Sequence, residues 1–203
     1  MDNPITNQLK NLKDFQSLNS IVAAGEPVAF PTDTLPALAC KPEVAAKLWQ
    51  LKQRPADKPL ILMAARVDEL LKALGEPPPA GWEQLADQGW PGGLTLVMPA
   101  SGLVSEALNP GGKSLGLRIP NSPRALELLK TTGPLATTSV NRSGEPACLN
   151  PQQIAKQFPD LALLAPLPWP PASGMASTVV AWKGADWYLV REGNLKIHGV
   201  KET

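Results

Sequence analysis

Short apolar runs of the kind that form buried strands alternate along this chain with segments whose apolar residues recur at helical spacing. Strands are expected over residues 28–30, 60–63, 94–98, 115–119, 135–140, 161–165, 178–182 and 187–190. Helices are expected over residues 6–24, 43–53, 67–74, 81–88, 122–129 and 150–158. This alternation is typical of an α/β domain built on a mixed sheet. We therefore predict the α/β fold class.

Glycine and proline mark the ends of several of these elements. Gly75 can terminate the helix over residues 67–74, and Ser122 followed by Pro123 is the cap and first residue of another helix. The 23 prolines are dispersed among the 203 residues, which does not indicate disorder. The irregular run over residues 76–80 is too short for a domain linker. We expect a single domain over residues 1–203.

Charge and composition exclude several classes of function. The formal net charge is +1, so no global field draws the chain to nucleic acid or membrane. No run of about 18 apolar residues and no signal peptide are present, which predicts a soluble cytoplasmic protein without a membrane partner. Cys40 and Cys148 are isolated and are expected as reduced thiols. His198 is the only histidine and is expected to be exposed near the C-terminus, which leaves little for a histidine metal site or a Ser-His-Asp triad.

A cluster of three cations lies between an expected helix and an expected strand. Lys52, Arg54 and Lys58 fall within seven residues, and Pro55 and Pro59 rule out a continuous helix through them. A short, stiff connection of this kind suits the binding of an anion, because arginine is a planar fork and lysine a mobile point charge. A solvated surface loop explains the same residues equally well.

Hydroxyl and amide side chains follow two expected strands and open a third. They occur in residues 31–34, 137–144 and 173–178. Ligands of α/β sheets usually lie beyond the carboxyl ends of strands, where such groups can bond phosphate or nucleotide oxygens. Ordinary turn chemistry is the alternative. The run over residues 110–114 ends like a phosphate-binding loop, but Ala107 stands where that motif needs glycine and a strand is expected after it, so we reject it.

Taken together, these segments resemble one family over nearly the whole chain, from the first helix to Gly193. The motifs are, in chain order, Pro31-Thr32-Asp33-Thr34, Lys52-Gln53-Arg54-Pro55 with Pro59-Leu60, Trp90-Pro91-Gly92-Gly93-Leu94-Thr95, Leu117-Arg118-Ile119-Pro120, Ser139-Val140-Asn141-Arg142-Ser143-Gly144, Ser177-Thr178-Val179-Val180 and Val190-Arg191-Glu192-Gly193. Their order and spacing resemble the YrdC family, the threonylcarbamoyl-adenylate synthases of tRNA modification, in its single-domain form.

The resemblance implies a twisted mixed sheet with flanking helices around a basic, concave cavity. It also implies an enzyme, a nucleotidyltransferase that joins L-threonine, bicarbonate and ATP into threonylcarbamoyl-adenylate and releases pyrophosphate. Mg²⁺ would accompany ATP, held by phosphate oxygens and water rather than by a protein cage. A partner transferase would then place the threonylcarbamoyl group on adenosine 37 of tRNA.

The resemblance also assigns roles to individual residues. Catalytic roles fall to Lys52, Arg54, Ser139 and Asn141. Binding of threonine and bicarbonate falls to Thr32, Thr34, Arg54, Lys58 and Arg118. Binding of ATP falls to Lys52, Ser139, Asn141, Ser143, Ser177 and Arg191. Lys52 and Arg54 are expected to face solvent in the cavity, so that replacing either would abolish product formation and leave the fold intact.

The chain departs from the family pattern at two places. The family usually has an apolar residue and then Tyr-Gly-Leu after Pro-Thr-Asp-Thr, where this chain has Leu35-Pro36-Ala37-Leu38. Alanine does not reach positive φ as cheaply as glycine, and Gly93 stands where the family usually has proline. Two alternatives to the synthase therefore stay open. One is a divergent paralogue with altered or lost turnover, and the other is a module that binds double-stranded RNA or tRNA in the same cavity.

Overall fold

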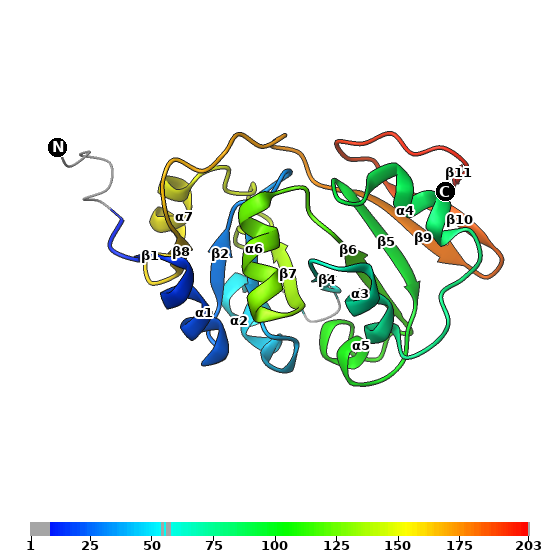
Figure 1. The fold of residues 1–203 in the computed structure, drawn as a ribbon, viewed down its shortest axis with the longest axis horizontal. Coiled ribbons are helices and arrows are strands. Elements are labelled where there is room, and N and C mark those ends of the chain that lie inside the picture. The colour runs from blue at the N-terminus through cyan, green and yellow to red at the C-terminus, as the bar shows by residue number, and fades with distance from the viewer. Residues whose placement is uncertain (1–8, 54, 56–57, 203) are drawn as a thin grey trace.

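A computed structural model describes residues 9–53, 55 and 58–202 of the chain. In this part of the chain, an eleven-stranded mixed sheet runs in the order β1-β8-β2-β3-β7-β4-β6-β5-β9-β10-β11 (Figure 1). The strands are β1 (Leu12–Lys13), β2 (Val28–Phe30), β3 (Ala37–Cys40), β4 (Ile61–Met63), β5 (Leu94–Pro99), β6 (Ser114–Arg118), β7 (Leu135–Ser139), β8 (Ala162–Leu164), β9 (Thr178–Lys183), β10 (Asp186–Arg191) and β11 (Lys201–Glu202). The predicted α/β class is confirmed.

Helices cover the sheet in two groups (Figure 1). They are α1 (Phe15–Ala23), α2 (Ala46–Lys52), α3 (Val67–Leu74), α4 (Trp82–Gly89), α5 (Leu103–Leu108), α6 (Pro123–Thr132) and α7 (Pro151–Gln157), with a 3₁₀ turn over Pro42–Val44. Figure 1 shows α1, α2, α6 and α7 around the half of the sheet that contains β2, β3 and β7. The other half, which contains β5 and β9, is flanked by α3, α4 and α5.

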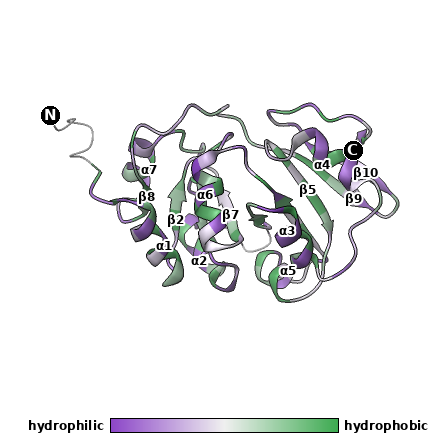
Figure 2. Cartoon of the chain, in the orientation of Figure 1, coloured by the Kyte–Doolittle hydropathy of each residue, from purple (hydrophilic) through white to green (hydrophobic). Residues whose placement is uncertain are grey.

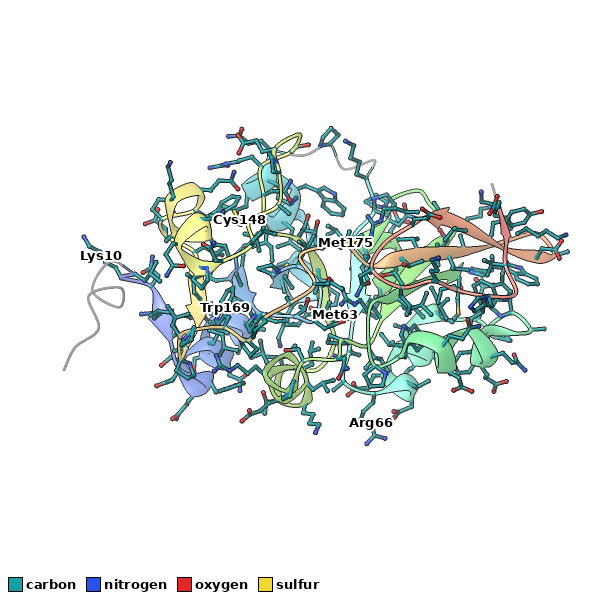
Figure 3. All side chains as sticks on the ribbon, turned by 90° about the horizontal axis from the view of Figure 1, so that it is seen from above. Lys10, Met63, Arg66, Cys148, Trp169 and Met175 are labelled. Carbon is teal, nitrogen blue, oxygen red and sulfur yellow. The ribbon has the colours of Figure 1, made fainter. Side chains whose placement is uncertain are left out.

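The core follows the two-residue period of the strands. Val28 and Phe30 of β2 pack with α1 and α6 on one face, whereas Ala29 between them belongs to the larger cluster on the other face. Figure 2 shows the apolar residues concentrated in the strands, and polar residues on the helices around them. In Figure 3, Lys10 and Arg66 lie at the periphery, while Met63 lies in the interior. Met63 is 3 % exposed.

Several local predictions are confirmed. Helix α3 spans Val67–Leu74, and Gly75 ends it in the left-handed conformation at φ 72°. Ser122 caps α6, with its side chain accepting the backbone N–H of Ala125. Ser114 begins a strand rather than a helix, which agrees with the rejection of a phosphate-binding loop at residues 110–114. The two cysteines are free and buried, and His198 is exposed.

Other boundaries differ from the sequence prediction. The helix expected from residue 6 begins only at Phe15, because the side chain of Asp14 accepts the backbone N–H of Ser17 and caps it there. Residues 12–13 instead pair with β8 as β1, and residues 6–8 lie outside the described residues. The expected helix over 43–53 is divided into the 3₁₀ turn and α2. Strand β3, helix α5 and strand β11 were not predicted.

Candidate active site

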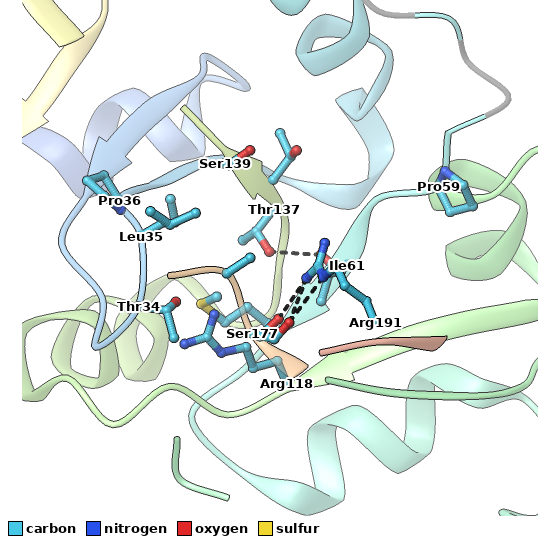
Figure 4. Close-up of a pocket in the computed structure, with 14 residues that line it drawn as sticks. Thr34, Leu35, Pro36, Pro59, Ile61, Arg118, Thr137, Ser139, Ser177 and Arg191 are labelled. Carbon is cyan, nitrogen blue, oxygen red and sulfur yellow. Dashed lines mark hydrogen bonds between the residues drawn. The ribbon is translucent and has the colours of Figure 1, made fainter. Parts of the chain in front are cut away.

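A cavity of about 160 Å³ opens where the central strands end (Figure 4). It is lined by Thr34, Leu35, Pro36, Ala37, Pro59, Ile61, Met63, Arg118, Thr137, Thr138, Ser139, Ala176, Ser177 and Arg191. These residues come from segments that are far apart in sequence but adjacent in the sheet, because β3, β7, β4 and β6 are consecutive neighbours in it. Among the described residues, this lining contains two arginines and no carboxylate, so the predicted basic, concave cavity is present.

Hydroxyl groups line part of the cavity and are fixed by bonds to neighbouring strands. The hydroxyl of Thr137 in β7 donates to the carbonyl of Ile61 in β4 at 3.0 Å (Figure 4). Ser177, which precedes β9, shares a hydrogen bond of 2.8 Å with Thr95 of β5. Ser177 is buried and has its hydroxyl at the cavity wall. The positions of the Thr137 and Ser177 hydroxyls are therefore set by neighbouring strands of the sheet.

Two guanidinium groups enter the same cavity. Arg118, at the end of β6, is 5 % exposed and forms an ion pair with Asp33 at 2.8 Å. Its Nε also donates to the carbonyl of Gly92 at 3.0 Å. Arg191, at the end of β10, donates to the carbonyl of Ser177 at 2.8 Å (Figure 4). Burial lowers the pKa of Arg118; Asp33 opposes this shift, and the positive charge of Arg191 adds to it.

The turn after β2 places one predicted residue in the cavity and one behind it. The Thr32 hydroxyl donates to the carbonyl of Leu35 at 2.7 Å and accepts the backbone N–H of Thr34 at 3.1 Å. Thr32 therefore stabilises the turn and does not line the cavity, whereas the buried Thr34 does. Thr32 lines a neighbouring cleft of about 470 Å³, which shares Thr34 and Pro36 with the cavity.

Lys52 lies in a different place from the one predicted. Its side chain is 1 % exposed and is not part of the cavity lining, so the prediction that it faces solvent in the cavity is wrong. As the last residue of α2, it is directed beneath the loop that follows β7. There its ammonium group donates to the carbonyl of Ser139 and to Oδ1 of Asn141, the latter at 2.9 Å. Lys52 therefore holds this loop in place.

Asn141 and Ser143 belong to the same loop, and their hydrogen bonds stabilise it. Oδ1 of Asn141 also accepts the Ser139 hydroxyl at 2.7 Å, and its Nδ2 donates to the carbonyl of Glu145 at 2.8 Å. The backbone N–H of Ser143 donates to the carbonyl of Lys52 at 2.8 Å. Of the predicted Ser-x-Asn pair, only Ser139 lines the cavity. The Asn141 side chain instead joins Lys52 to the loop.

Two further predicted cations are not placed in the cavity. Arg54 lies outside the described residues. Lys58 is exposed and does not line the cavity, although its carbonyl accepts the indole N–H of Trp49 at 2.9 Å. The structure therefore brings together five of the predicted residues, namely Thr34, Arg118, Ser139, Ser177 and Arg191.

The two departures from the family pattern have structural explanations. Leu35, Pro36 and Ala37 line the cavity, so the first departure falls in the site itself. Ala37 belongs to β3 and is not among the described residues with positive φ. The cost of positive φ for alanine therefore does not arise at this position. A side chain at Gly93 would meet Asn194, whose Oδ1 lies 2.1 Å from the ideal Cβ position.

Several cavity residues were missed by motif reasoning. Ile61, Met63 and Pro59 form an apolar part of the wall, and Thr138 adds a further position on β7. Their position at or beside the ends of β4 and β7 is a signal that would have identified them. Among the described residues, no group of three or more His, Cys, Asp or Glu side chains is arranged to hold a metal ion. No helix in the described part of the chain has the length and apolarity to cross a membrane.

Comparison with known proteins gives consistent matches. A family model named Sua5_yciO_yrdC and described as "Telomere recombination" matches residues 20–193. The chain is 35 % identical over 156 residues to the threonylcarbamoyl-AMP synthase of Vibrio campbellii, covering 73 % of this chain and 83 % of that protein. It is 32 % identical over 184 residues to the Bacillus subtilis protein of the same name, covering 87 % of this chain and 52 % of that one.

Among solved structures, the chain matches Pyrococcus abyssi Sua5 in complex with L-threonine. The TM-score is 0.86 at 26 % sequence identity, and the match covers 95 % of this chain and 62 % of the other. The chain thus spans most of the Vibrio relative but only about half of the Bacillus one.

Proposed function

The chain belongs to the Sua5/YciO/YrdC family, and we propose that it is a threonylcarbamoyl-AMP synthase. The proposed substrates are L-threonine, bicarbonate and ATP, and the products are threonylcarbamoyl-AMP, pyrophosphate and water. One observation carries this proposal: Arg118 and Arg191 enter a single cavity that is also lined by the hydroxyls of Thr34, Ser139 and Ser177. This combination suits substrates that carry carboxylate and phosphate groups.

The proposed chemistry forms a C–N and an O–P bond, and it breaks a C–O bond of bicarbonate and one phosphoanhydride bond of ATP. The amine of threonine takes up the carbon of bicarbonate with loss of water, which gives N-carboxy-threonine. An oxygen of this new carboxylate then attacks the α-phosphorus of ATP, and the bond to the departing pyrophosphate breaks. Every reactant is anionic or carries a carboxylate, so bringing them together costs electrostatic repulsion. Arg118 and Arg191 offset this repulsion in a partly dry cavity.

The positions of the residues support a division of labour. Thr34 belongs to the turn after β2, and Arg118 at the end of β6 is bonded to Asp33 of that turn. We propose that Arg118 and Thr34 hold the carboxylates of threonine and its carbamate. Ser177 and Arg191 are bonded to each other and are proposed to contact phosphate oxygens, together with Ser139. Catalysis would come mostly from positioning and charge stabilisation.

The remaining predicted residues have less direct proposed roles. Lys52 and Asn141 act on substrate through the loop that they stabilise, which presents the Ser139 hydroxyl. For Arg54 we keep the proposed catalytic role and the binding of threonine and bicarbonate. The described lining residues include no carboxylate, so Mg²⁺ would enter with ATP, bound mainly by phosphate oxygens and water, and would neutralise part of their charge. We further propose that a separate transferase moves the product's threonylcarbamoyl group to adenosine 37 of tRNA in the cytoplasm.

The test is the release of pyrophosphate from Mg-ATP by the purified chain, with threonine and bicarbonate each omitted in turn. We expect release only when both are present, together with a product of the mass of threonylcarbamoyl-AMP. Release that needs neither compound would indicate simple ATP hydrolysis and would contradict the proposal. The Arg191→Met variant, which keeps the length of the side chain without the charge, is expected to raise the KM for ATP.

A second candidate is a divergent paralogue with another acyl donor or with reduced turnover. The observation in its favour is that Leu35 and Pro36 line the cavity where the family usually has an apolar residue and tyrosine. The double variant Pro36→Tyr/Ala37→Gly distinguishes the two. A large gain in threonine-dependent turnover in the variant would favour the paralogue, whereas unchanged or lower turnover would favour the synthase.

A further inference from the structure

Asp33 lies directly behind Arg118 and outside the cavity lining. Its Oδ1 accepts Nη2 of Arg118 at 2.8 Å and the backbone N–H of Asn121 at 3.0 Å. The side chains of the pair are 6 % exposed for Arg118 and 16 % for Asp33. We propose that Asp33 is a positioning residue that sets both the orientation and the effective charge of Arg118 toward anionic substrates, an inference that rests on the proposed function.

The contacts of Arg118 show how this orientation is fixed. Nε donates to the Gly92 carbonyl and Nη2 donates to Asp33, so both bonds lie on one edge of the planar guanidinium. The plane of the group is thereby held in the absence of substrate, and the group itself remains at the cavity wall. A donor that is already oriented costs no reorganisation when an anion arrives.

The turn that carries Asp33 does not depend on the carboxylate for its own structure. The backbone N–H of Ser173 donates to the Asp33 carbonyl at 3.0 Å, and that of Gly174 donates to the Thr34 carbonyl at 3.1 Å. The Ser122 hydroxyl donates to the carbonyl of Pro31 at 3.2 Å. Because these bonds use the main chain of the turn, the Asp33 side chain is left with Arg118 and the N–H of Asn121 as its partners in the described part of the chain.

The charges around Arg118 indicate what Asp33 adds besides orientation. Burial lowers the pKa of Arg118 and the nearby Arg191 cation lowers it further, whereas Asp33 acts in the opposite direction. Asp33 therefore stabilises the buried cation when no substrate is present. It also offsets part of the positive charge that anions meet, which weakens the hold on pyrophosphate and favours its release.

Two variants separate orientation from charge. Asp33→Asn keeps an oxygen that can accept from Arg118 and Asn121 but removes the charge, while Asp33→Ala removes both. The matched control is Asp68→Asn, because Asp68 forms a similar pair with Arg66 on the surface, where both side chains are 67 % exposed. The readouts are the KM for L-threonine and bicarbonate, kcat, the melting temperature, and the affinity for inorganic pyrophosphate by calorimetry.

For Asp33→Ala we expect the KM for threonine or bicarbonate to rise about tenfold or more, because the unsupported guanidinium loses its orientation. For Asp33→Asn we expect pyrophosphate to bind several-fold more tightly than in the unmodified chain, with a lower kcat and a smaller change in KM. Asp68→Asn should change neither the KM values nor the affinity for pyrophosphate. If both Asp33 variants lower only the melting temperature and leave KM and pyrophosphate affinity unchanged, Asp33 is purely structural and the inference is wrong.

The two proposals can fail separately. If the unmodified chain releases no pyrophosphate while Asp33→Asn binds inorganic pyrophosphate several-fold more tightly than the unmodified chain, the proposed function fails and the role of Asp33 stands. If the unmodified chain is active and the variants match it in KM and pyrophosphate affinity, the role of Asp33 fails and the proposed function stands.

Discussion

Replacing Lys52 by methionine tests whether this lysine is part of the structural frame of the site. The side chain is 1 % exposed, and its ammonium group donates to the Ser139 carbonyl and to Asn141. Hydrogen bonds from a charged donor contribute about 1.5–3 kcal/mol each. Removal of two would cost about 3–6 kcal/mol, from which the relief of the desolvation of the buried cation must be subtracted.

We therefore expect Lys52→Met to lower the free energy of unfolding by about 2–4 kcal/mol, because methionine fills the space but donates neither to the Ser139 carbonyl nor to Oδ1 of Asn141. For a chain of this size, this corresponds to a melting temperature lower by about 5–15 °C. Denaturant titration should show a lower midpoint with an unchanged slope, which indicates a change in stability rather than in the unfolded state.

Lys47→Met is the matched control, because Lys47 lies on the same helix and also makes two bonds. Its ammonium donates to the Gly25 carbonyl and to Glu26, each at 2.8 Å, but its side chain is 37 % exposed. Exposed ion pairs contribute about 0–1 kcal/mol, so this variant should unfold close to the unmodified chain. If Lys52→Met is as stable as Lys47→Met and only pyrophosphate release is lost, the buried position of Lys52 is wrong and its ammonium faces the substrate.

Three further perturbations give distinct expected results. Arg118→Lys loses the planar fork that donates to both Asp33 and the Gly92 carbonyl. The KM for threonine should therefore rise about tenfold, and an unchanged KM would exclude Arg118 from substrate binding. Gly193→Ala places a Cβ 2.3–2.5 Å from backbone atoms of residues 176–178. It should lower the free energy of unfolding by about 1–3 kcal/mol, measured by a thermal melt, and full stability would contradict this close packing. Burial raises the pKa of the Cys40 thiol from 9.0 to about 12. The unfolded chain then loses this proton at a lower pH than the folded chain, so stability falls with rising pH above about 9. Cys40→Ala should make the decline in melting temperature between pH 9 and 11 less steep, and identical slopes would refute the shift.

Local signals in the sequence were sufficient for much of the fold. Helix α3 ends at Gly75 because the left-handed conformation is cheap for glycine, and Ser122 caps α6 with its own side chain. These features depend on residues a few positions apart. Strand β3 was not predicted because its sequence, Ala37–Cys40, is rich in small residues with weak strand preference. It forms because β2 and β7 pair with it on either side.

The sequence likewise predicted some features of the candidate site and not others. Arg118, Ser177 and Arg191 were assigned to the site from the family resemblance, and the sheet brings the strand ends that carry them together. The position of Lys52 could not be predicted, because its partners Ser139 and Asn141 lie 87 and 89 residues further along the chain. A motif names the residue types that gather at a site, but it does not say which of them face the ligand.

The sequence by itself determined the element types, the α/β class, the family and most of the cations and hydroxyls of the cavity, since each of these is encoded in local spacing or in the order of motifs. Only the tertiary structure decided that Lys52 supports a loop, that Thr32 stabilises a turn and that Asp33 holds Arg118. The physical reason is that a buried polar group must find its hydrogen-bond partners wherever the fold places them, and those partners come from distant segments.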